Sequence, residues 1–202
     1  MTILQPPFTL RSAAGLPSQP RPLAESVLVI IDGQIEYSEQ GRLPLAGLDR
    51  ALARIGSLLG EARDLESPVV HVSHQGSAGG LFDPTGGGRF LPSIGPADKE
   101  PVVHKSLPNA FAGTDLSSHL SQIGERPLVL VGFMTHMCVS STARAALDLG
   151  YEATVVGDAT ATRSLPAVSG GPAIEAGDVQ RVALAELADR FSIVTETSTL
   201  LT

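Results

Sequence analysis

The one cysteine of this 202-residue chain, Cys138, lies where a nucleophile would be useful. The preceding residues 128–131 are an unbroken apolar run, which is typical of a strand buried on both faces. Small residues at helical spacing follow, so a strand, a tight turn and a helix place the thiol near a helix N-terminus. The helix dipole predicts a lowered thiol pKa, and nearby N–H groups could hold an oxyanion. The alternative is that Cys138 packs as a small hydrophobic side chain.

Two further reactive side chains also follow predicted strands. Asp32 comes directly after the apolar run 26–31, and Lys105 comes after the short run 101–104. Because the carboxyl ends of parallel strands gather at one edge of a sheet, we expect Asp32, Lys105 and Cys138 to converge. The carboxylate could then accept the thiol proton and return it to a leaving amine, while the ammonium lowers the pKa of both groups. The alternatives are that Asp32 caps a turn and that Lys105 is a solvated surface charge.

Strands alternate with helices along the chain, and this alternation predicts how the reactive side chains are positioned. Short apolar runs indicate buried strands, and the stretches between them have apolar residues at helical spacing. We therefore expect an α/β fold: a single-domain, doubly wound, Rossmann-like parallel sheet of about six strands with helices on both faces. The predicted strands are 26–31, 68–73, 101–104, 128–131, 152–157 and 191–195, and the predicted helices include 44–63, 114–123 and 173–190.

Two segments show little periodicity. Residues 1–23 contain five prolines and are expected to form an extended, proline-rich N-terminal arm, with a disordered tail as the alternative. The main domain then comprises residues 24–202. Residues 75–97 form a long glycine-rich loop, which in a compact domain predicts a lid, a binding loop or a subunit contact. Its aromatic residues, Phe82 and Phe90, are candidates for contact with a substrate or a partner.

The composition excludes several classes of partner. The net charge is −7 and basic residues do not cluster, which argues against nucleic acid and anionic membranes. No apolar run approaches the roughly 20 residues that a membrane span needs. One cysteine cannot form an internal disulfide, which favours a reducing compartment, and the first residues lack the pattern of a signal peptide. We therefore expect a cytoplasmic protein that acts on a small molecule.

Three motifs surround these reactive residues and together resemble those of one known family. In their order and spacing they are similar to the motifs of the isochorismatase-like cysteine hydrolases, the superfamily that includes nicotinamidases and N-carbamoylsarcosine amidohydrolase. The resemblance covers about residues 26–196. The matching pieces are V-I-I-D-G-Q at 29–34, H-K at 104–105 with N-A-F at 109–111 and T-D-L at 114–116, G-F-M-T-H-M-C-V at 132–139 with T-A-R-A-A at 142–146, and D-A at 158–159.

The resemblance implies a role for each reactive residue. Cys138 would be the nucleophile, Asp32 the base and Lys105 the third member of a catalytic triad. A cis peptide bond is implied between Phe133 and Met134, which would turn the Met134 N–H, with that of Cys138, into an oxyanion hole. The Asp-x-His element of metal-dependent nicotinamidases is missing after the second predicted strand. We therefore expect no metal and no cofactor.

These features predict a hydrolase that cleaves a small-molecule amide through a thioester intermediate. Isochorismatases that cleave a vinyl ether lack the cysteine, so the presence of Cys138 favours amide hydrolysis. The alternatives are vinyl-ether hydrolysis, with Cys138 as a bystander, and a non-catalytic binding or redox-sensing protein. Family members are commonly oligomers, and exposed apolar residues such as Phe82 and Phe90 would suit a homo-oligomer. The residues expected to line the substrate pocket, each with ordinary packing as its alternative, are Gln34, Tyr37, His74, Phe111 and His136.

Overall fold

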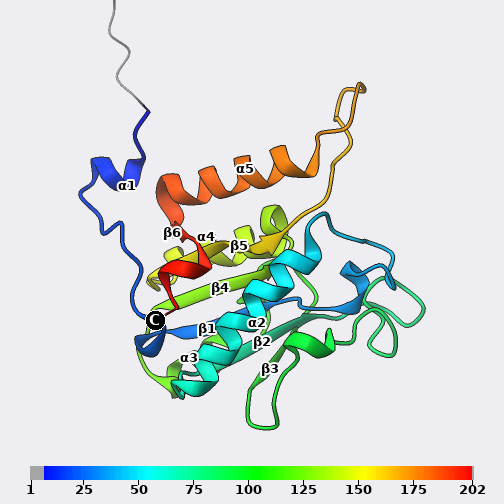
Figure 1. Ribbon diagram of the computed structural model, residues 1–202. Helices are drawn as coiled ribbons and strands as arrows, with labels where there is room; N and C mark the ends of the chain where they lie inside the picture. Colours follow the sequence, from blue (N-terminus) through cyan, green and yellow to red (C-terminus); the bar gives the residue numbers. More distant parts are fainter. Residues whose placement is uncertain (1–6, 202) are drawn as a thin grey trace, which may run out of the picture.

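The computed structural model describes residues 7–201, and its centre is one six-stranded parallel sheet (Figure 1). The strand order is β3-β2-β1-β4-β5-β6, which confirms the predicted doubly wound α/β fold. The winding direction changes between β1 and β4, and ligands of such sheets bind at the carboxyl ends of the strands beside this point. The strands are β1 (Val27–Ile31), β2 (Val69–His74), β3 (Val102–Lys105), β4 (Leu128–Phe133), β5 (Ala153–Ala161) and β6 (Ile193–Thr195).

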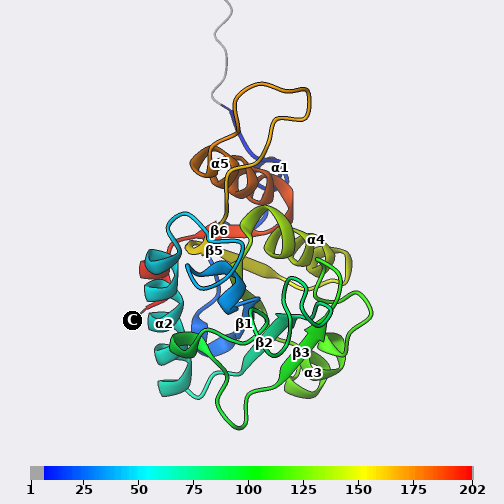
Figure 2. The same ribbon diagram turned by 90° about the vertical axis from the view of Figure 1, so that its right-hand side faces the viewer.

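Helices cover both faces of this sheet, as Figure 2 shows. Helix α2 (Leu48–Asp64) packs on one face, whereas α3 (Leu116–Ile123) and α4 (Ser140–Asp148) pack on the other. Helix α5 (Ala176–Glu186) lies beside the β5–β6 edge, where its Gln180 side chain donates a 3.2 Å hydrogen bond to the Gly157 carbonyl. The sheet is therefore the middle layer of three, and its carboxyl edge is left for loops.

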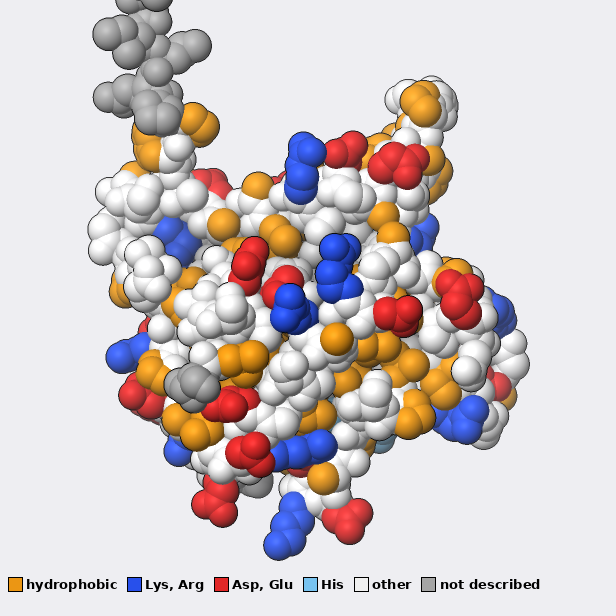
Figure 3. Space-filling model, in the orientation of Figure 1, with side chains coloured by type: hydrophobic (Ala, Val, Ile, Leu, Met, Phe, Trp, Pro, Cys, Tyr) orange, Lys and Arg blue, Asp and Glu red, His pale blue; other side chains and the backbone are white. Residues whose placement is uncertain are grey.

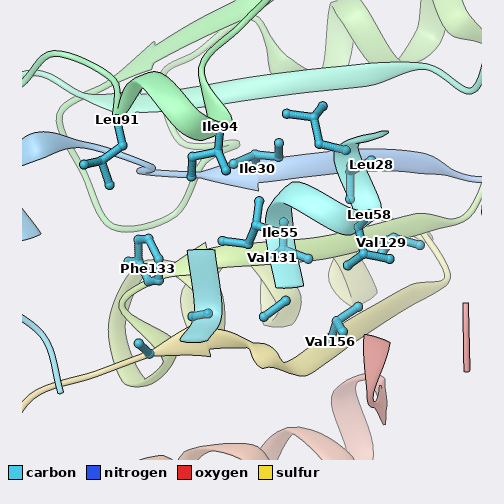
Figure 4. Close-up of a cluster of buried hydrophobic side chains, with 14 of the residues drawn as sticks. Leu28, Ile30, Ile55, Leu58, Leu91, Ile94, Val129, Val131, Phe133 and Val156 are labelled. Carbon is cyan, nitrogen blue, oxygen red and sulfur yellow. The ribbon is translucent and has the colours of Figure 1, made fainter. Parts of the chain in front are cut away.

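Alternate side chains of β1 point into two hydrophobic cores, one on each face of the sheet. Leu28 and Ile30 point into the core beneath α2, where they join Ile55 of that helix (Figure 4). Val29 and Ile31 point into the other core, which α3 and α4 cover. A strand buried on both faces is apolar throughout, and each such side chain contributes roughly 1.5–3 kcal/mol when fully buried. The strand ends that carry the reactive residues therefore stand on a rigid support.

Several element boundaries differ from the prediction, among them the start of α2 and the end of β5. Helix α2 begins at Leu48 rather than at residue 44, because Ala46 pairs with Thr162 and Gly47 takes a left-handed conformation. Strand β5 extends to Ala161 rather than ending at 157, because it pairs with β4 again after an irregularity in the ladder. This second stretch of pairing supports the end of β4, just before the turn that carries the cysteine.

The proline-rich arm is described from residue 7 onward, and residues 1–6 lie outside the described part of the chain. A single helical turn, α1 (Leu10–Ala13), interrupts the arm and is capped by the Thr9 hydroxyl. The Leu10 N–H donates a 2.9 Å hydrogen bond to the Asp189 carboxylate, which ties the arm to the body. Across residues 7–201, no helix is long and apolar enough to cross a membrane.

Gly132 in β4 occupies a position where a side chain has no room. Its φ of +110° is rarely adopted by L residues, and a Cβ there would overlap the Ile31 carbonyl of β1. Gly132→Ala is therefore expected to lower the free energy of unfolding by about 3 kcal/mol or more, measured by urea unfolding. Gly56→Ala is the matched control, because a Cβ in the middle of α2 meets open space and should add roughly 0.5–1 kcal/mol. An unchanged Gly132→Ala midpoint would contradict this account of the β1–β4 contact.

Candidate active site

The side chains of Asp32, Lys105 and Cys138 meet at the carboxyl edge of the sheet. Asp32 follows β1, Lys105 is the last residue of β3, and Cys138 lies in the turn after β4. The Lys105 ammonium nitrogen is 2.7 Å from Asp32 Oδ2 and 3.2 Å from Cys138 Sγ. Asp32 is fully buried, Lys105 is 2% exposed and Cys138 is 5% exposed. The structure therefore brings together three groups that are far apart in the sequence.

The turn that carries the cysteine is anchored to both neighbouring strands. A cis peptide bond joins Phe133 to Met134 at the end of β4, as the resemblance implies. A π-helical turn, η4 (Thr135–Val139), follows and continues directly into α4. The hydroxyl at its first position donates a 3.1 Å hydrogen bond to the Ala161 carbonyl at the end of β5. The sulfur is therefore presented from a fixed backbone close to a helix N-terminus, as the sequence predicts.

Asp32 is aimed by its own backbone. Its φ of +50° lies in the left-handed region, which aspartate tolerates better than most residues. Its N–H donates a 2.9 Å hydrogen bond to the Val72 carbonyl of β2, and its carbonyl accepts one of 2.8 Å from the Gln34 N–H. These bonds turn the chain sharply at the end of β1 and direct the carboxylate toward Lys105.

Burial dominates the ionisation of the sulfur. Burial and then the charge of Asp32 raise the pKa of the Cys138 thiol to about 12, although Lys105 opposes both. The pKa of Asp32 is also raised by burial, while Lys105 and a hydrogen bond with Cys138 work against the rise. The predicted lowering of the thiol pKa is therefore wrong. Lys105 does contact the sulfur, but the sequence could not show how completely the site is buried, nor that the effects of burial and of the Asp32 charge exceed that of Lys105.

Asp32 and Cys138 are best described as sharing one proton beside the charged Lys105. With Lys105 charged, one negative charge balances the buried site, and a second would be uncompensated. Asp32 supplies that charge in the resting state while Cys138 keeps its proton. Moving the proton from sulfur to carboxylate leaves the total charge unchanged, so the two groups titrate as a pair. This arrangement can generate the thiolate as the sulfur attacks, although the resting state contains the neutral thiol.

Titration of the cysteine provides a test that needs no substrate. The chain has a single cysteine, so cysteine labelled with ¹³C at Cβ gives one NMR signal. Because the pKa is raised, we expect the thiol chemical shift to persist beyond about pH 9, whereas a free thiol titrates near about 8.5. The folded state also holds this proton more tightly than the unfolded chain, so the free energy of unfolding should fall as the pH rises above about 8.5. A thiolate signal at neutral pH would contradict the shared-proton arrangement.

Gln34 and Tyr37, two of the predicted pocket residues, are buried beside the site. The side-chain amide of Gln34 forms hydrogen bonds with backbone groups. Its Nε2 donates to the carbonyls of His74 and Gly88, and its Oε1 accepts from the His74 N–H. Tyr37 is 1% exposed and packs edge-on against Phe82, with ring centroids 5.3 Å apart. Both residues support the walls of the site, and their contact with a substrate stays a prediction.

The remaining predicted pocket residues differ in how close they come to the reactive groups. His74 is half-buried, and its Nδ1 lies 3.3 Å from the ammonium nitrogen of Lys105. His136 is half-buried in η4, where its Nδ1 hydrogen bonds with the Thr162 hydroxyl. Phe111 stacks on a tyrosine ring with centroids 5.6 Å apart. Of these three, His74 is the one that contacts the lysine, and a substrate-binding role stays a prediction for all of them.

The glycine-rich segment 75–97 is fastened to the chain just after β1. Backbone N–H groups of Ile35 and Glu36 donate to the carbonyls of Arg89 and Gly87, at 2.9 and 2.8 Å. The buried Glu36 carboxylate also forms a 3.0 Å ion pair with Arg42, whose guanidinium donates to the Gly80 carbonyl of the same segment. The segment is therefore a fixed wall beside the site in this structure.

The aromatic residues of this segment pack against other rings of the chain. Phe82 is 9% exposed and packs on the rings of Tyr37 and His74, the latter with centroids 4.9 Å apart. Phe90 is half-buried, with its ring 5.8 Å from that of His71. The expectation that both side chains are exposed is therefore wrong for Phe82, whereas Phe90 is exposed in part. Hydrophobic packing beneath a folded-back loop explains them.

Two buried polar residues near the site were not found by the sequence analysis. Glu36 clamps the glycine-rich segment, and Thr135 anchors the turn that carries the cysteine. A polar residue in an otherwise buried stretch is the only signal that either one gives. Their partners, Arg42 and the Ala161 carbonyl, follow from the tertiary fold alone.

Two hollows of the surface differ in their relation to the reactive groups. A hollow of about 410 Å³ at the ends of β2 and β3 is lined in part by Lys105 and His104. A larger cavity of about 640 Å³ lies between α2, β5 and α5, and neither Asp32 nor Cys138 lines it. Among residues 7–201, no three His, Cys, Asp or Glu side chains are grouped closely enough to hold a metal ion.

Known proteins are similar to this chain in sequence and in fold. The isochorismatase domain model matches residues 26–199. A secreted isochorismatase effector of Verticillium dahliae is 38% identical, over 91% of this chain and 94% of that protein. The ureidoacrylate amidohydrolase of Variovorax paradoxus is 28% identical, over 83% of this chain and 80% of that protein. The crystal structure of an isochorismatase from Pseudomonas putida matches with a TM-score of 0.91 and 41% identity, covering 96% of this chain and 100% of that one.

Proposed function

Because this chain belongs to the isochorismatase family and is one of its hydrolases, we propose that it cleaves the C–N bond of a small-molecule amide, with Cys138 as the nucleophile. The observation that carries the proposal is the contact of Lys105 with both Asp32 and Cys138. A carboxylate, an ammonium and a thiol in contact supply a base, a fixed charge and a nucleophile. The relative described as an amidohydrolase supports the C–N bond as the target.

Acylation uses the proton that the site already holds. Asp32 takes the proton from the Cys138 thiol as the sulfur attacks the amide carbonyl, so that an S–C bond forms and the carbonyl π electrons move to oxygen. The proton then passes from Asp32 to the amide nitrogen, the C–N bond breaks, and ammonia or an amine leaves a thioester behind. Lys105 stays protonated throughout and holds the carboxylate beside the sulfur.

Hydrolysis of the thioester uses the same groups. Asp32 takes a proton from water as the water oxygen attacks the thioester carbonyl. The C–S bond then breaks, the sulfur regains a proton from Asp32, and a carboxylic acid leaves. We propose that the N–H groups of Met134 and Cys138 bind the oxyanion in both steps. Their position before α4, whose dipole favours negative charge, supports this assignment.

A second candidate is hydrolysis of a vinyl ether in an isochorismate-like acid. The relatives from Verticillium dahliae and Pseudomonas putida, both described as isochorismatases, favour it. In that reaction Asp32 would protonate the vinyl ether, and Cys138 would take no part. The retained cysteine and its contact with Lys105 favour the amide reaction, because vinyl-ether cleavage needs neither.

A substrate panel separates the two candidates. The wild-type protein is incubated with primary amides, ureido acids, N-carbamoyl amino acids and isochorismate, and the release of ammonia, amine and pyruvate is measured. We expect release of ammonia or amine from at least one amide class, and no pyruvate from isochorismate. Pyruvate release without turnover of any amide would overturn the amide proposal in favour of the second candidate.

We also propose that the enzyme works in the cytoplasm as a homo-oligomer on a small-molecule substrate, with neither nucleic acid nor membrane as a partner. The single cysteine supports a reducing compartment. Basic and acidic side chains are interspersed on the face shown in Figure 3, which supports the exclusion of nucleic acid. Exposed apolar side chains such as Ile174 and Val182, 46% and 56% exposed, support a subunit contact. Light scattering after size exclusion tests the oligomeric state, and a monomer at all concentrations would overturn the proposed homo-oligomer.

A further inference from the structure

The Lys105 ammonium group has three N–H donors, and three acceptors surround it. They are Asp32 Oδ2 at 2.7 Å, Cys138 Sγ at 3.2 Å and His74 Nδ1 at 3.3 Å. An ammonium nitrogen carries three hydrogens and no lone pair, so each contact takes one of them. A buried charge is tolerated when all of its donors are paired, and Lys105 meets this condition through His74 as much as through the other two residues.

The contact with Lys105 determines the state of the His74 ring. A ring nitrogen accepts a hydrogen bond only when it carries no proton, so Nδ1 is bare and the proton of the neutral ring lies on Nε2. Burial lowers the pKa of His74, and the charge of Lys105 lowers it further against the opposing effect of Asp32. Neutral His74 is therefore the form present at pH 7.

We infer that His74 is a positioning residue for Lys105: by accepting the third hydrogen bond, it directs the ammonium group at Asp32 and Cys138. Its importance for turnover rests on the proposed function, but the contact itself does not. Without an acceptor at this place, one donor of a buried ammonium would be unpaired, and the long lysine side chain would gain freedom to leave the sulfur. The inference thus adds a fourth residue to the site.

His74 is itself held in place from two directions. The Gln34 amide binds both backbone groups of His74, at 2.9 and 2.8 Å, and the Phe82 ring lies against the imidazole. The ionisable groups that face the imidazole are Lys105 and Asp32, whereas Phe82 brings no charge. Protonation at Nδ1 would replace the acceptor with a cation beside Lys105. We therefore expect the hydrogen bond from the Lys105 ammonium to the Cys138 sulfur to weaken at pH values below the pKa of His74.

Two substitutions at position 74 test this inference. His74→Leu removes the acceptor, whereas His74→Asn keeps an oxygen near the position of Nδ1 and cannot titrate. The readout is the rate constant of Cys138 alkylation by iodoacetamide, which is proportional to the thiolate fraction. Because Lys105 favours the thiolate, we expect His74→Leu to react about three- to tenfold more slowly than wild type at pH 8, and His74→Asn to stay within about twofold. His119→Leu on α3 is the matched control, because this histidine pairs instead with Asp115, the residue just before its own helix.

The tautomer is measured separately in protein labelled with ¹⁵N at histidine. We expect the His74 signals to report a bare Nδ1 that shifts when Lys105→Met removes its donor. A proton on Nδ1, or a His74→Leu variant that alkylates as fast as wild type, would overturn the inference. Neither measurement uses hydrolysis, so failure of the amide proposal would leave both results interpretable.

Discussion

Cys138→Ala is expected to lower kcat/KM for amide hydrolysis by about 10⁴-fold or more. The sulfur is the only group in the proposal that forms a bond to the substrate, and no other cysteine can replace it. The substitution should leave the fold intact, because it removes one atom from a buried position and adds none. Steady-state kinetics on the best amide of the panel measure the loss.

The same variant separates the candidate reactions. Circular dichroism and the urea midpoint serve as controls for folding. If Cys138→Ala retained full amide turnover, covalent catalysis would be wrong. If it retained full release of pyruvate from isochorismate, the vinyl-ether reaction, in which Cys138 takes no part, would be the correct description.

Asp32→Asn is expected to lower kcat/KM by about 10³- to 10⁴-fold, since the amide cannot take the thiol proton. The substitution should also change the pKa of the Cys138 thiol, in the direction that favours the thiolate. With the carboxylate gone, the buried ammonium of Lys105 is left without a counter-charge, and the Cys138 thiol is the group that can supply one. The thiol pKa should therefore fall, as measured by the ¹³C signal of the cysteine, while hydrolysis is lost.

Lys105→Met provides the matched comparison. It removes the ammonium and leaves the Asp32 carboxylate beside the sulfur, so the thiol pKa should rise further above its ordinary value. Opposite shifts in the two variants, each with loss of hydrolysis, would show that turnover depends on proton transfer within the group. A fall in thiol pKa accompanied by faster hydrolysis in Asp32→Asn would contradict the role of Asp32 as base.

The convergence of the three reactive residues could be predicted because it depends on topology. Asp32, Lys105 and Cys138 each follow an apolar run, and parallel strands leave their carboxyl ends at one edge. The direction of the thiol pKa could not be predicted in the same way. It depends on how completely water is excluded and on which charge lies nearer the sulfur, and both are set by tertiary packing.

The glycine-rich segment could likewise be predicted only in part: its existence could, but its contacts could not. Its length and composition indicated a loop with a role at the site, but they did not distinguish a lid from a wall. The antiparallel contact of Gln34 with Phe90 and the ion pair of Glu36 with Arg42 join residues with no periodic relation in the sequence. For the same reason Phe82 could be named as a candidate contact residue while its actual neighbours, Tyr37 and His74, could not.

Trapping the acyl-enzyme tests the central claim most directly. The wild-type protein is mixed with the amide that it hydrolyses fastest, quenched in acid at a series of early times, and weighed intact by mass spectrometry. The proposal predicts a mass gain equal to that of the acyl group, located on the peptide that contains Cys138, which appears with the first release of amine and decays as the acid forms. Turnover with no mass gain at any quench time, together with undiminished turnover by Cys138→Ala, would contradict it.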